Sequence, residues 1–541
     1  MTTMDTHAGT TITGRVASSN GVAAVLQGVA AWVTTTDHKR IGRLFIGLAA
    51  AGCLIALTIA SLLGFERISA DGYVLFGADN FAQFFSFFRA ELIFGVVLPM
   101  LLGVAIAIVP LQVGAKSISF ARGAMFGLWS WLAGIAMVEI SYLGNGGPGG
   151  GDSTMVDLFL LGMILLAVGL ISASASVIVT VLNSRCSGMT LGKAPIFAWS
   201  ALIGASALVF TLPVLIGNLI YNYADHSHGR VAFGGNVGVN EWISWSFSQP
   251  QTYVFVLPIL GVLAELVAVT AKSRHALRGV ILTGIGLAAT SVIGGVTQTQ
   301  QTLDWTGSAG DKIRDLVPWA IFNVLPIVGV LVVLGASLFI FTTHPPRIVT
   351  PFVPALLGVG MVVTGMVGHA ISTISRANLA TTVFEEAEFI YVMYGGLLGI
   401  MAAVAYWGPK WWGRKLPDKA VMGTATIAFL GTVLAALPYY VAGFADQPAA
   451  TAAGFSYSGP QEIWNTLSTI GHVLVLIAVI QFIVVAFVAF RAGEVAGDDP
   501  WDGQTLEWTT SSPAPTNNFT EVPVVTSSEP LLDRKSTGGA S

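Results

Sequence analysis

The chain has 541 residues, of which 54% are hydrophobic and only 10% are charged, and its mean hydropathy is +0.74. Soluble domains carry about 25% charged residues, so this composition excludes a large soluble protein and indicates a polytopic membrane protein. The net charge of −4 comes without a basic cluster, and nothing in the composition points to a nucleic-acid partner.

Twelve apolar segments are long enough to cross a bilayer, which takes ~20 residues. Each is predicted to be a helix, because an open strand edge cannot satisfy its backbone hydrogen bonds in lipid. The sequence therefore predicts an all-α membrane domain over residues 41–490, between an N-terminal segment (1–40) and a C-terminal tail (491–541). The predicted spans are 41–64, 85–113, 122–143, 155–182, 197–221, 246–271, 278–303, 317–342, 350–372, 387–408, 421–444 and 463–490.

Lys and Arg are distributed unequally between the two sides that these spans define. If the N-terminus is cytoplasmic, 19 of the 25 fall in inside segments. Cytoplasmic loops are enriched in Lys and Arg, so we expect both termini in the cytoplasm. The apolar stretch from Gly21 to Val33 is too short to span and is expected at the interface. Residues after about Arg491 are rich in Pro, Ser and Thr and are expected to form an extended tail, partly disordered near its end.

Several longer motifs follow one another along the chain. They are TTTDHKRIGRLF (34–45), VPLQVGA (109–115), NSRCSGMTLGKAPIFAW (183–199), LPVLIG (212–217), SQPQTYVFVLP (248–258), YWGPKWWGRKLP (406–417) and PWDGQTLEWTTSSPAPTNNF (500–519). In this order they resemble the large catalytic subunit of the A-type haem-copper oxidases, cytochrome c oxidase subunit I. The resemblance runs from about Thr34 to Val525.

The resemblance implies a twelve-helix subunit I fold in the inner membrane of a bacterial cell. It also implies electron transfer from cytochrome c to oxygen with proton pumping. Two haems and a copper would be held by six histidines inside the membrane, and relatives of the oxidase's second and third subunits would be partners. This chain has eight histidines in total, and only His369 and His472 lie in predicted spans.

The residues at the positions of the haem ligands differ from the family's histidines. Phe88 corresponds to the ligand of the family's second helix. In the tenth helix, the segment AEFIY places Glu388 and Ile390 where the family has the two histidines of an HFH motif. Phe and Ile carry no donor atom, whereas a haem iron needs an axial ligand such as His, Cys, Met or Tyr. His369 and His472 do not occupy the ligand positions.

Glutamines stand at the copper positions. Gln249 in the sixth helix and Gln300 and Gln301 in the seventh correspond to the copper histidines, and Gln251 corresponds to the family's proton-gating glutamate. Copper needs several imidazoles in a fixed geometry, and a neutral amide is a poor ligand. With Gln298, these amides are expected either to hydrogen-bond between helices or to line a polar cavity for a small molecule or a quinone headgroup.

Other functional positions of the family also differ. Ser117 stands in place of the proton-uptake aspartate, and Tyr439 and Tyr440 in place of the arginines that hold the haem propionates. Tyr253 does match the tyrosine that the family bonds to a copper histidine, but Gln249 cannot form that cross-link. Tyr253 is therefore either a catalytic candidate or a hydrogen-bonded membrane tyrosine.

Charged residues lie on the second and tenth predicted helices, namely Arg89, Glu91, Glu385, Glu386 and Glu388. A charge near the bilayer centre costs at least ~2.5–3.5 kcal/mol, so these groups should pair or face water. In the family the two helices face each other across one haem. We expect Arg89 or a neighbour to pair with a glutamate there, as a structural ion pair or within a water-filled proton relay that uses Glu388.

We therefore expect no haem, no copper and no other metal. The leading hypothesis is a divergent paralogue that acts as a non-catalytic or repurposed component of a bacterial respiratory complex, with the lipid bilayer and subunit II- or III-like proteins as partners. Two alternatives stay open: an active terminal oxidase with atypical ligands, and a channel or transporter that uses the vacated haem cavity.

Overall fold

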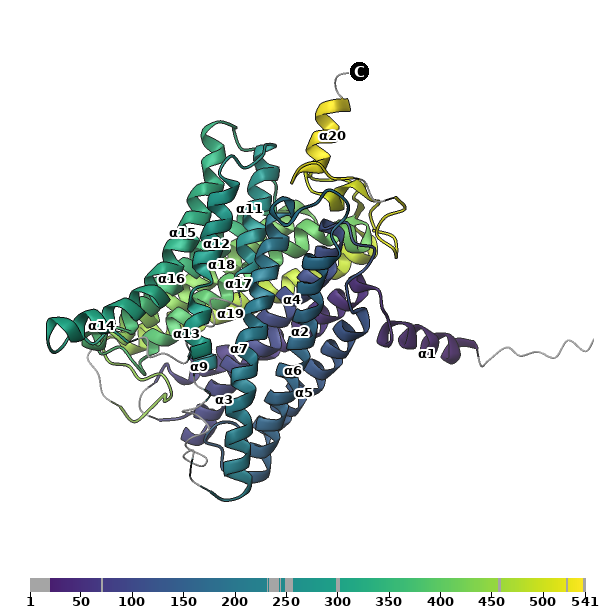
Figure 1. The fold of residues 1–541 in the computed structure, drawn as a ribbon. Coiled ribbons are helices and arrows are strands. Elements are labelled where there is room, and N and C mark those ends of the chain that lie inside the picture. Colours follow the sequence, from purple (N-terminus) through teal and green to yellow (C-terminus); the bar gives the residue numbers. More distant parts are fainter. Residues whose placement is uncertain are drawn as a thin grey trace, which may run out of the picture.

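The structure is a computed structural model that describes residues 20–69, 72–230, 232, 243, 245–248, 256–297, 302–455, 459–521 and 524–538. Its long helices pack side by side in one bundle (Figure 1). Among the described residues, ten helices are long and apolar enough to cross a membrane. The chain is thus an all-α polytopic membrane protein, as predicted.

Eight of these ten spans are single helices. They are α2 (His38–Glu66), α5 (Ala121–Leu143), α6 (Ser153–Asn183), α7 (Ile196–Ser227), α16 (Phe352–Ser372), α17 (Val383–Trp412), α18 (Asp418–Gly443) and α19 (Gln461–Ala492).

The other two are composite helices. One joins α3 (Ala78–Ala90), the π-helix η1 (Glu91–Val97) and α4 (Leu98–Gln112), and the other joins α14 (Ala309–Trp319), η3 (Ala320–Val324), α15 (Leu325–Leu338) and η4 (Phe339–Thr342).

The two remaining predicted spans, 246–271 and 278–303, each contain shorter helices, and each lies partly outside the described residues. The first holds α9 (Trp245–Ser248) and α11 (Pro258–Ala271), and the second holds α12 (Arg278–Ala288) and α13 (Ser291–Thr297). The minor elements are η2 (Leu191–Lys193), η5 (Ser375–Ala377), η6 (Leu506–Thr509) and a small antiparallel pair, β1 (Arg414–Lys415) with β2 (Glu494–Val495).

Two predicted helix starts were wrong. The second span begins at Ala78 rather than residue 85, and the eighth begins at Ala309 rather than residue 317. At Ala309 the reason is local: Ser308 and Asp311 form a capping box that satisfies free backbone N–H groups before the apolar run begins. An apolar-length criterion does not detect such polar first turns.

Helices α4 and α17 form the centre of the bundle (Figure 1). Within the most apolar stretch of each of these two spans, every residue is buried. Helix α17 contacts α16, α18, α11 and α4. A helix that is apolar all round belongs in the interior. Small residues let neighbouring helices approach closely: a Cβ atom on Gly471 of α19 would lie 2.1 Å from the backbone nitrogen of Ala435 on α18.

The N-terminal apolar stretch forms α1 (Asn20–Val33), which projects from the side of the bundle (Figure 1). Its 14 residues are too few to span a bilayer, as expected. Its location at a membrane interface stays a prediction.

The C-terminal region is not an extended tail, which corrects the expectation. It packs on the end of the bundle from which α1 projects, and it ends in α20 (Pro530–Gly538) (Figure 1). The indole N–H of Trp501 donates to the Tyr406 carbonyl (2.9 Å), and that of Trp508 donates to the Tyr406 hydroxyl (3.0 Å). The Pro, Ser and Thr content was a poor guide because a few large side chains attach this segment.

The two ends of the chain also meet. Asn518 Oδ1 lies 2.9 Å from His38 Nε2 and accepts from Lys39 Nζ (3.1 Å), and its amide donates to the Ala115 carbonyl (2.8 Å). The residues belong to three of the motifs quoted above, at 34–45, 109–115 and 500–519. We call the docked segment, residues 500–519, the tail dock.

Glu507 lies at the buried centre of the tail dock. Its Oε1 accepts from Trp407 Nε1 (3.1 Å) and from Gln112 Nε2 (3.1 Å). The same Gln112 amide donates to both oxygens of Glu265, at 3.0 and 2.8 Å. Burial raises the pKa of the Glu507 carboxyl above its ordinary value.

This raised pKa makes the tail dock sensitive to pH. In the unfolded chain the Glu507 carboxyl loses its proton near pH ~4.3, which is below its pKa in the folded protein. The free energy of unfolding therefore decreases as the pH rises from that point through the folded pKa. Glu507→Gln removes this titration. We expect the melting temperature of the wild type, relative to that of Glu507→Gln, to decrease as the pH rises above about 4.3, the pKa of an unfolded glutamate.

The measurement is tryptophan-fluorescence melting of the purified protein at several pH values. Glu521→Gln changes an exposed carboxyl of the same C-terminal region and should follow the wild-type profile. Parallel profiles for the wild type and Glu507→Gln would contradict this account.

Candidate functional site

Phe88 lies at the meeting point of three spans. Its side chain is fully buried on α3 and makes edge-to-face contacts with two rings. The ring centroid of Phe389 on α17 is 5.8 Å away, and that of His472 on α19 is 6.3 Å away. Aromatic pairs prefer this arrangement, so Phe88, which the sequence analysis aligned with a haem ligand, is part of a packed aromatic core.

His472 is engaged by a tyrosine in this core. Its Nδ1 is 2.8 Å from the hydroxyl of Tyr394 on α17, and the two rings are perpendicular. The imidazole is 1% exposed. Burying a polar group is costly unless it is hydrogen-bonded, and Tyr394 provides that bond. Sequence reasoning singled out His472 but not its partner.

Glu388 and His369 form a second polar group, between α17 and α16. His369 Nδ1 is 3.0 Å from Glu388 Oε1, and the Ser372 hydroxyl donates to Glu388 Oε2 at 3.0 Å. Both ionisable side chains are 7% exposed. Ile390, two residues further along α17, is fully buried. The structure thus brings together two residues that the sequence had left unconnected.

Arg67, which the sequence analysis did not single out, makes the buried ion pair of this region. It follows α2 directly, and its Nη2 is 2.8 Å from Glu386 Oε2, with the two side chains 1% and 2% exposed. Nη1 donates to the Tyr439 hydroxyl (3.1 Å), and a further bond reaches the Ala449 carbonyl. Its guanidinium also lies over the rings of Phe81 (5.3 Å) and Tyr439 (5.2 Å).

Arg89 does not make the carboxylate pair that was expected of it. Its Nη2 donates instead to the backbone carbonyl of Glu385 (3.4 Å). Its guanidinium lies over the rings of Phe85 (5.1 Å) and Phe389 (4.9 Å). A buried ion pair with a glutamate of α17 does exist, but its cation is Arg67, which follows α2 rather than lying on the second span. Tyr439, which the sequence analysis aligned with a propionate-binding arginine, was the signal that could have directed attention there.

Glu91 begins the π-helix η1 and is 1% exposed. Its carboxyl packs against two glycines, Gly52 of α2 and Gly95. A Cβ atom would lie 2.2 Å from Glu91 Oε1 if it were added to Gly52, and 2.1 Å if it were added to Gly95. Its Oε2 is buried and has no hydrogen-bond partner among the described residues. Single π turns are frequent at functional sites, and here the turn directs the carboxyl toward α2.

The copper positions cannot be placed. Gln249, Gln251, Tyr253, Gln300 and Gln301 lie outside the described residues, so their expected roles stay predictions. In the part of the chain that the structure describes, no group of three or more His, Cys, Asp or Glu side chains could hold a metal ion.

Two of the three residues that the sequence analysis aligned with haem ligands cannot bind a haem iron. Neither Phe88 nor Ile390 carries a donor atom for iron. The third aligned residue, Glu388, is engaged by His369 and Ser372. The ring of Phe88 contacts those of Phe389 and His472.

Comparison with known proteins identifies the family. The model of the family described as "Cytochrome C and Quinol oxidase polypeptide I" matches residues 40–474. The chain belongs to this family. The match starts within α2 and ends within α19, so it covers the membrane bundle.

Curated relatives align along nearly the whole chain. Cytochrome c oxidase subunit 1 of Bacillus subtilis is 27% identical over 94% of this chain and 83% of the relative. A probable cytochrome c oxidase subunit 1-beta of Nocardia farcinica is 28% identical over 93% and 87%. Quinol oxidase subunit 1 of Bacillus subtilis is 26% identical over 93% and 80%. The chain is thus similar to subunit I proteins of both named oxidase types.

Removing one member of the Arg67–Glu386 pair should be strongly destabilising. Arg67→Met leaves a carboxylate buried without its cation, which typically costs ~3–5 kcal/mol. We expect that loss in the free energy of unfolding, measured by denaturant titration in mixed micelles. The double variant Arg67→Met/Glu386→Met should recover most of it, because two apolar side chains carry no unpaired charge.

The control is Arg274→Met, which breaks an exposed ion pair with Asp533. It should change stability by less than ~1 kcal/mol. If Arg67→Met costs no more than this control, the buried pair does not stabilise the fold.

Proposed function

We propose that this chain is a non-catalytic or repurposed subunit I of a bacterial respiratory membrane complex and that it binds neither haem nor copper. The observation that carries the proposal is the packing of Phe88 against Phe389 and His472. The alignment of Phe88 with a family iron ligand comes from the sequence, and the packing supports the proposal because a hydrocarbon ring has no donor atom for iron. An oxidase needs a donor at that position to hold the haem that receives its electrons.

The second support is the location of the residues that still resemble the oxidases. His38, Trp508 and Asn518 belong to the terminal motifs, and their contacts hold the two ends of the chain on the bundle. These motifs stabilise the fold without taking part in redox chemistry. A chain that retains them keeps its two ends docked on the bundle, and we propose that subunit II- or III-like partners recognise this assembled end. We place both termini in the cytoplasm, following the Lys and Arg distribution.

The channel alternative assigns the proton path to Glu388, one of the buried carboxylates on the tenth span. Intramembrane ionisable residues are functional candidates by default. Here both carboxylate oxygens are engaged, by His369 and Ser372. This arrangement favours a structural role, in which the carboxylate joins α16 to α17.

The direct test is a reduced-minus-oxidised spectrum of the purified full-length protein, with haem and copper quantified on the same sample. We expect less than about 0.1 haem and 0.1 copper per chain, because the ligand positions lack suitable donors. A histidine-containing subunit I produced in the same host is the control for cofactor supply. The same preparation should co-purify a subunit II- or III-like protein.

Haem bands at one or more haems per chain would refute the proposal and favour an active oxidase with atypical ligands. Proton flux into liposomes that is abolished by Glu388→Gln would also refute it, in favour of a channel.

A further inference from the structure

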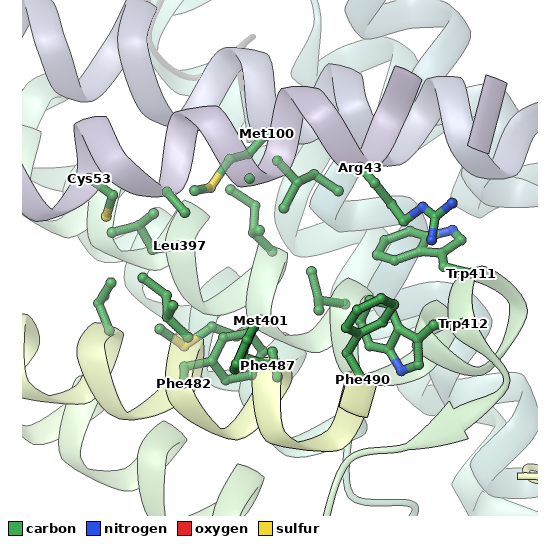
Figure 2. A pocket seen from close by; sticks show the side chains of 18 of the residues that line it. Arg43, Cys53, Met100, Leu397, Met401, Trp411, Trp412, Phe482, Phe487 and Phe490 are labelled. Carbon is green, nitrogen blue, oxygen red and sulfur yellow. The ribbon is translucent and has the colours of Figure 1, made fainter. Parts of the chain in front are cut away.

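A cavity of about 450 Å³ lies between α2, α17 and α19 (Figure 2), and Phe88 is not among its lining residues. Leu397, Met401 and Phe482 are among the apolar side chains that line it, and Met100 of α4 closes one side. Cys53 is at one end, and Trp411, Trp412 and Arg43 are at the other (Figure 2). Among its described lining residues, Arg43 carries the only charge.

The end with Arg43 has the composition of a membrane interface. The Arg43 guanidinium lies 5.1 Å from the ring centroid of Trp32, which also lines the cavity. Trp side chains are enriched at the level of the lipid headgroups. Phe487 and Phe490, also lining residues, are 58% and 43% exposed, so the cavity borders the surface that the bundle presents to lipid.

Positive charge exceeds negative charge around this opening. Arg40 also lies over Trp32 (5.5 Å), and Arg491 lies over Phe487 (5.3 Å). Asp37 is the nearby acid, and it is engaged by Lys39 Nζ at 2.9 Å and by Arg40 Nε at 3.9 Å. Within the described residues, no carboxylate oxygen lies within 4.0 Å of Arg43, whose Nε donates to the Lys39 carbonyl. An anion can therefore approach its terminal nitrogens.

We propose that this cavity binds one acyl chain of an anionic phospholipid, with the lipid phosphate at Arg43. The apolar lining matches a hydrocarbon chain, and the opening toward the lipid-facing surface gives a bilayer lipid access. A guanidinium binds phosphate oxygens with geometrically matched hydrogen bonds. An acyl chain gains little free energy when it moves from the hydrocarbon of the bilayer into an apolar cavity. The selectivity for an anionic headgroup therefore comes from Arg43.

The test separates the charge from the cavity. Arg43→Gln removes the cation, and Gly47→Leu places a side chain into the cavity from α2. A Cβ atom on Gly47 meets nothing within 4 Å, so the substitution is compatible with folding. The matched controls are Arg122→Gln, at an exposed arginine in the first turn of α5, and Gly217→Leu on α7, where a Cβ atom also meets nothing within 4 Å.

Each full-length protein is reconstituted in nanodiscs with equal amounts of phosphatidylglycerol and phosphatidylcholine, re-extracted in detergent, and assayed for retained lipid by native mass spectrometry. The wild type and both controls should retain one phosphatidylglycerol per chain. Arg43→Gln should lose at least about fivefold of its preference for the anionic lipid, in line with the attraction of one basic residue near a charged surface. Gly47→Leu should retain neither lipid. Melting temperatures verify that each variant is folded.

Three results would overturn the proposal. The first is equal retention of the two lipids by the wild type, which would leave a cavity without headgroup recognition. The second is unchanged phosphatidylglycerol retention in both Arg43→Gln and Gly47→Leu. The third is a stoichiometric neutral quinone in the wild-type extract, displaced by Gly47→Leu, which would make the occupant a different class of molecule.

Discussion

The hydrocarbon core of a bilayer contains no water, so each polar side chain within it needs a partner inside the protein. Arg67 with Glu386, Glu388 with His369 and Ser372, and His472 with Tyr394 meet this requirement in the described bundle. Together with the aromatic packing around Phe88, these pairs hold the helices close to one another.

The same constraint explains why the family is still recognisable in this chain. The terminal motifs carry polar groups that must be satisfied at the end of the bundle, and they satisfy one another: Asn518 bonds His38, Lys39 and the Ala115 carbonyl. Such a network depends on several segments at once. Replacing any one member leaves buried partners unpaired, which costs about 1–3 kcal/mol per group. Residues that bind only a cofactor have no such interdependence once the cofactor is gone.

Much of the fold could be predicted from the sequence, because apolar length alone determines which segments can cross a bilayer. The partners of the charged residues could not be predicted, since a helix of known span has an unknown rotation. Arg89 was the predicted partner of a glutamate and Arg67 was not considered, and only the three-dimensional packing places Arg67 beside Glu386 and Arg89 over Phe389. The tail dock was missed because composition averages over residues, whereas Trp501 and Trp508 determine where that segment lies.

The central claim is that the bundle is complete without a cofactor. The most direct test is to produce the protein in a host that cannot synthesise haem and to compare its yield and melting temperature with those from a haem-sufficient host. The account predicts the same folded yield and a melting temperature that is unchanged within error, because Phe88, Phe389 and His472 already form a packed core. A protein that aggregates or melts at a markedly lower temperature only in the haem-deficient host would contradict it.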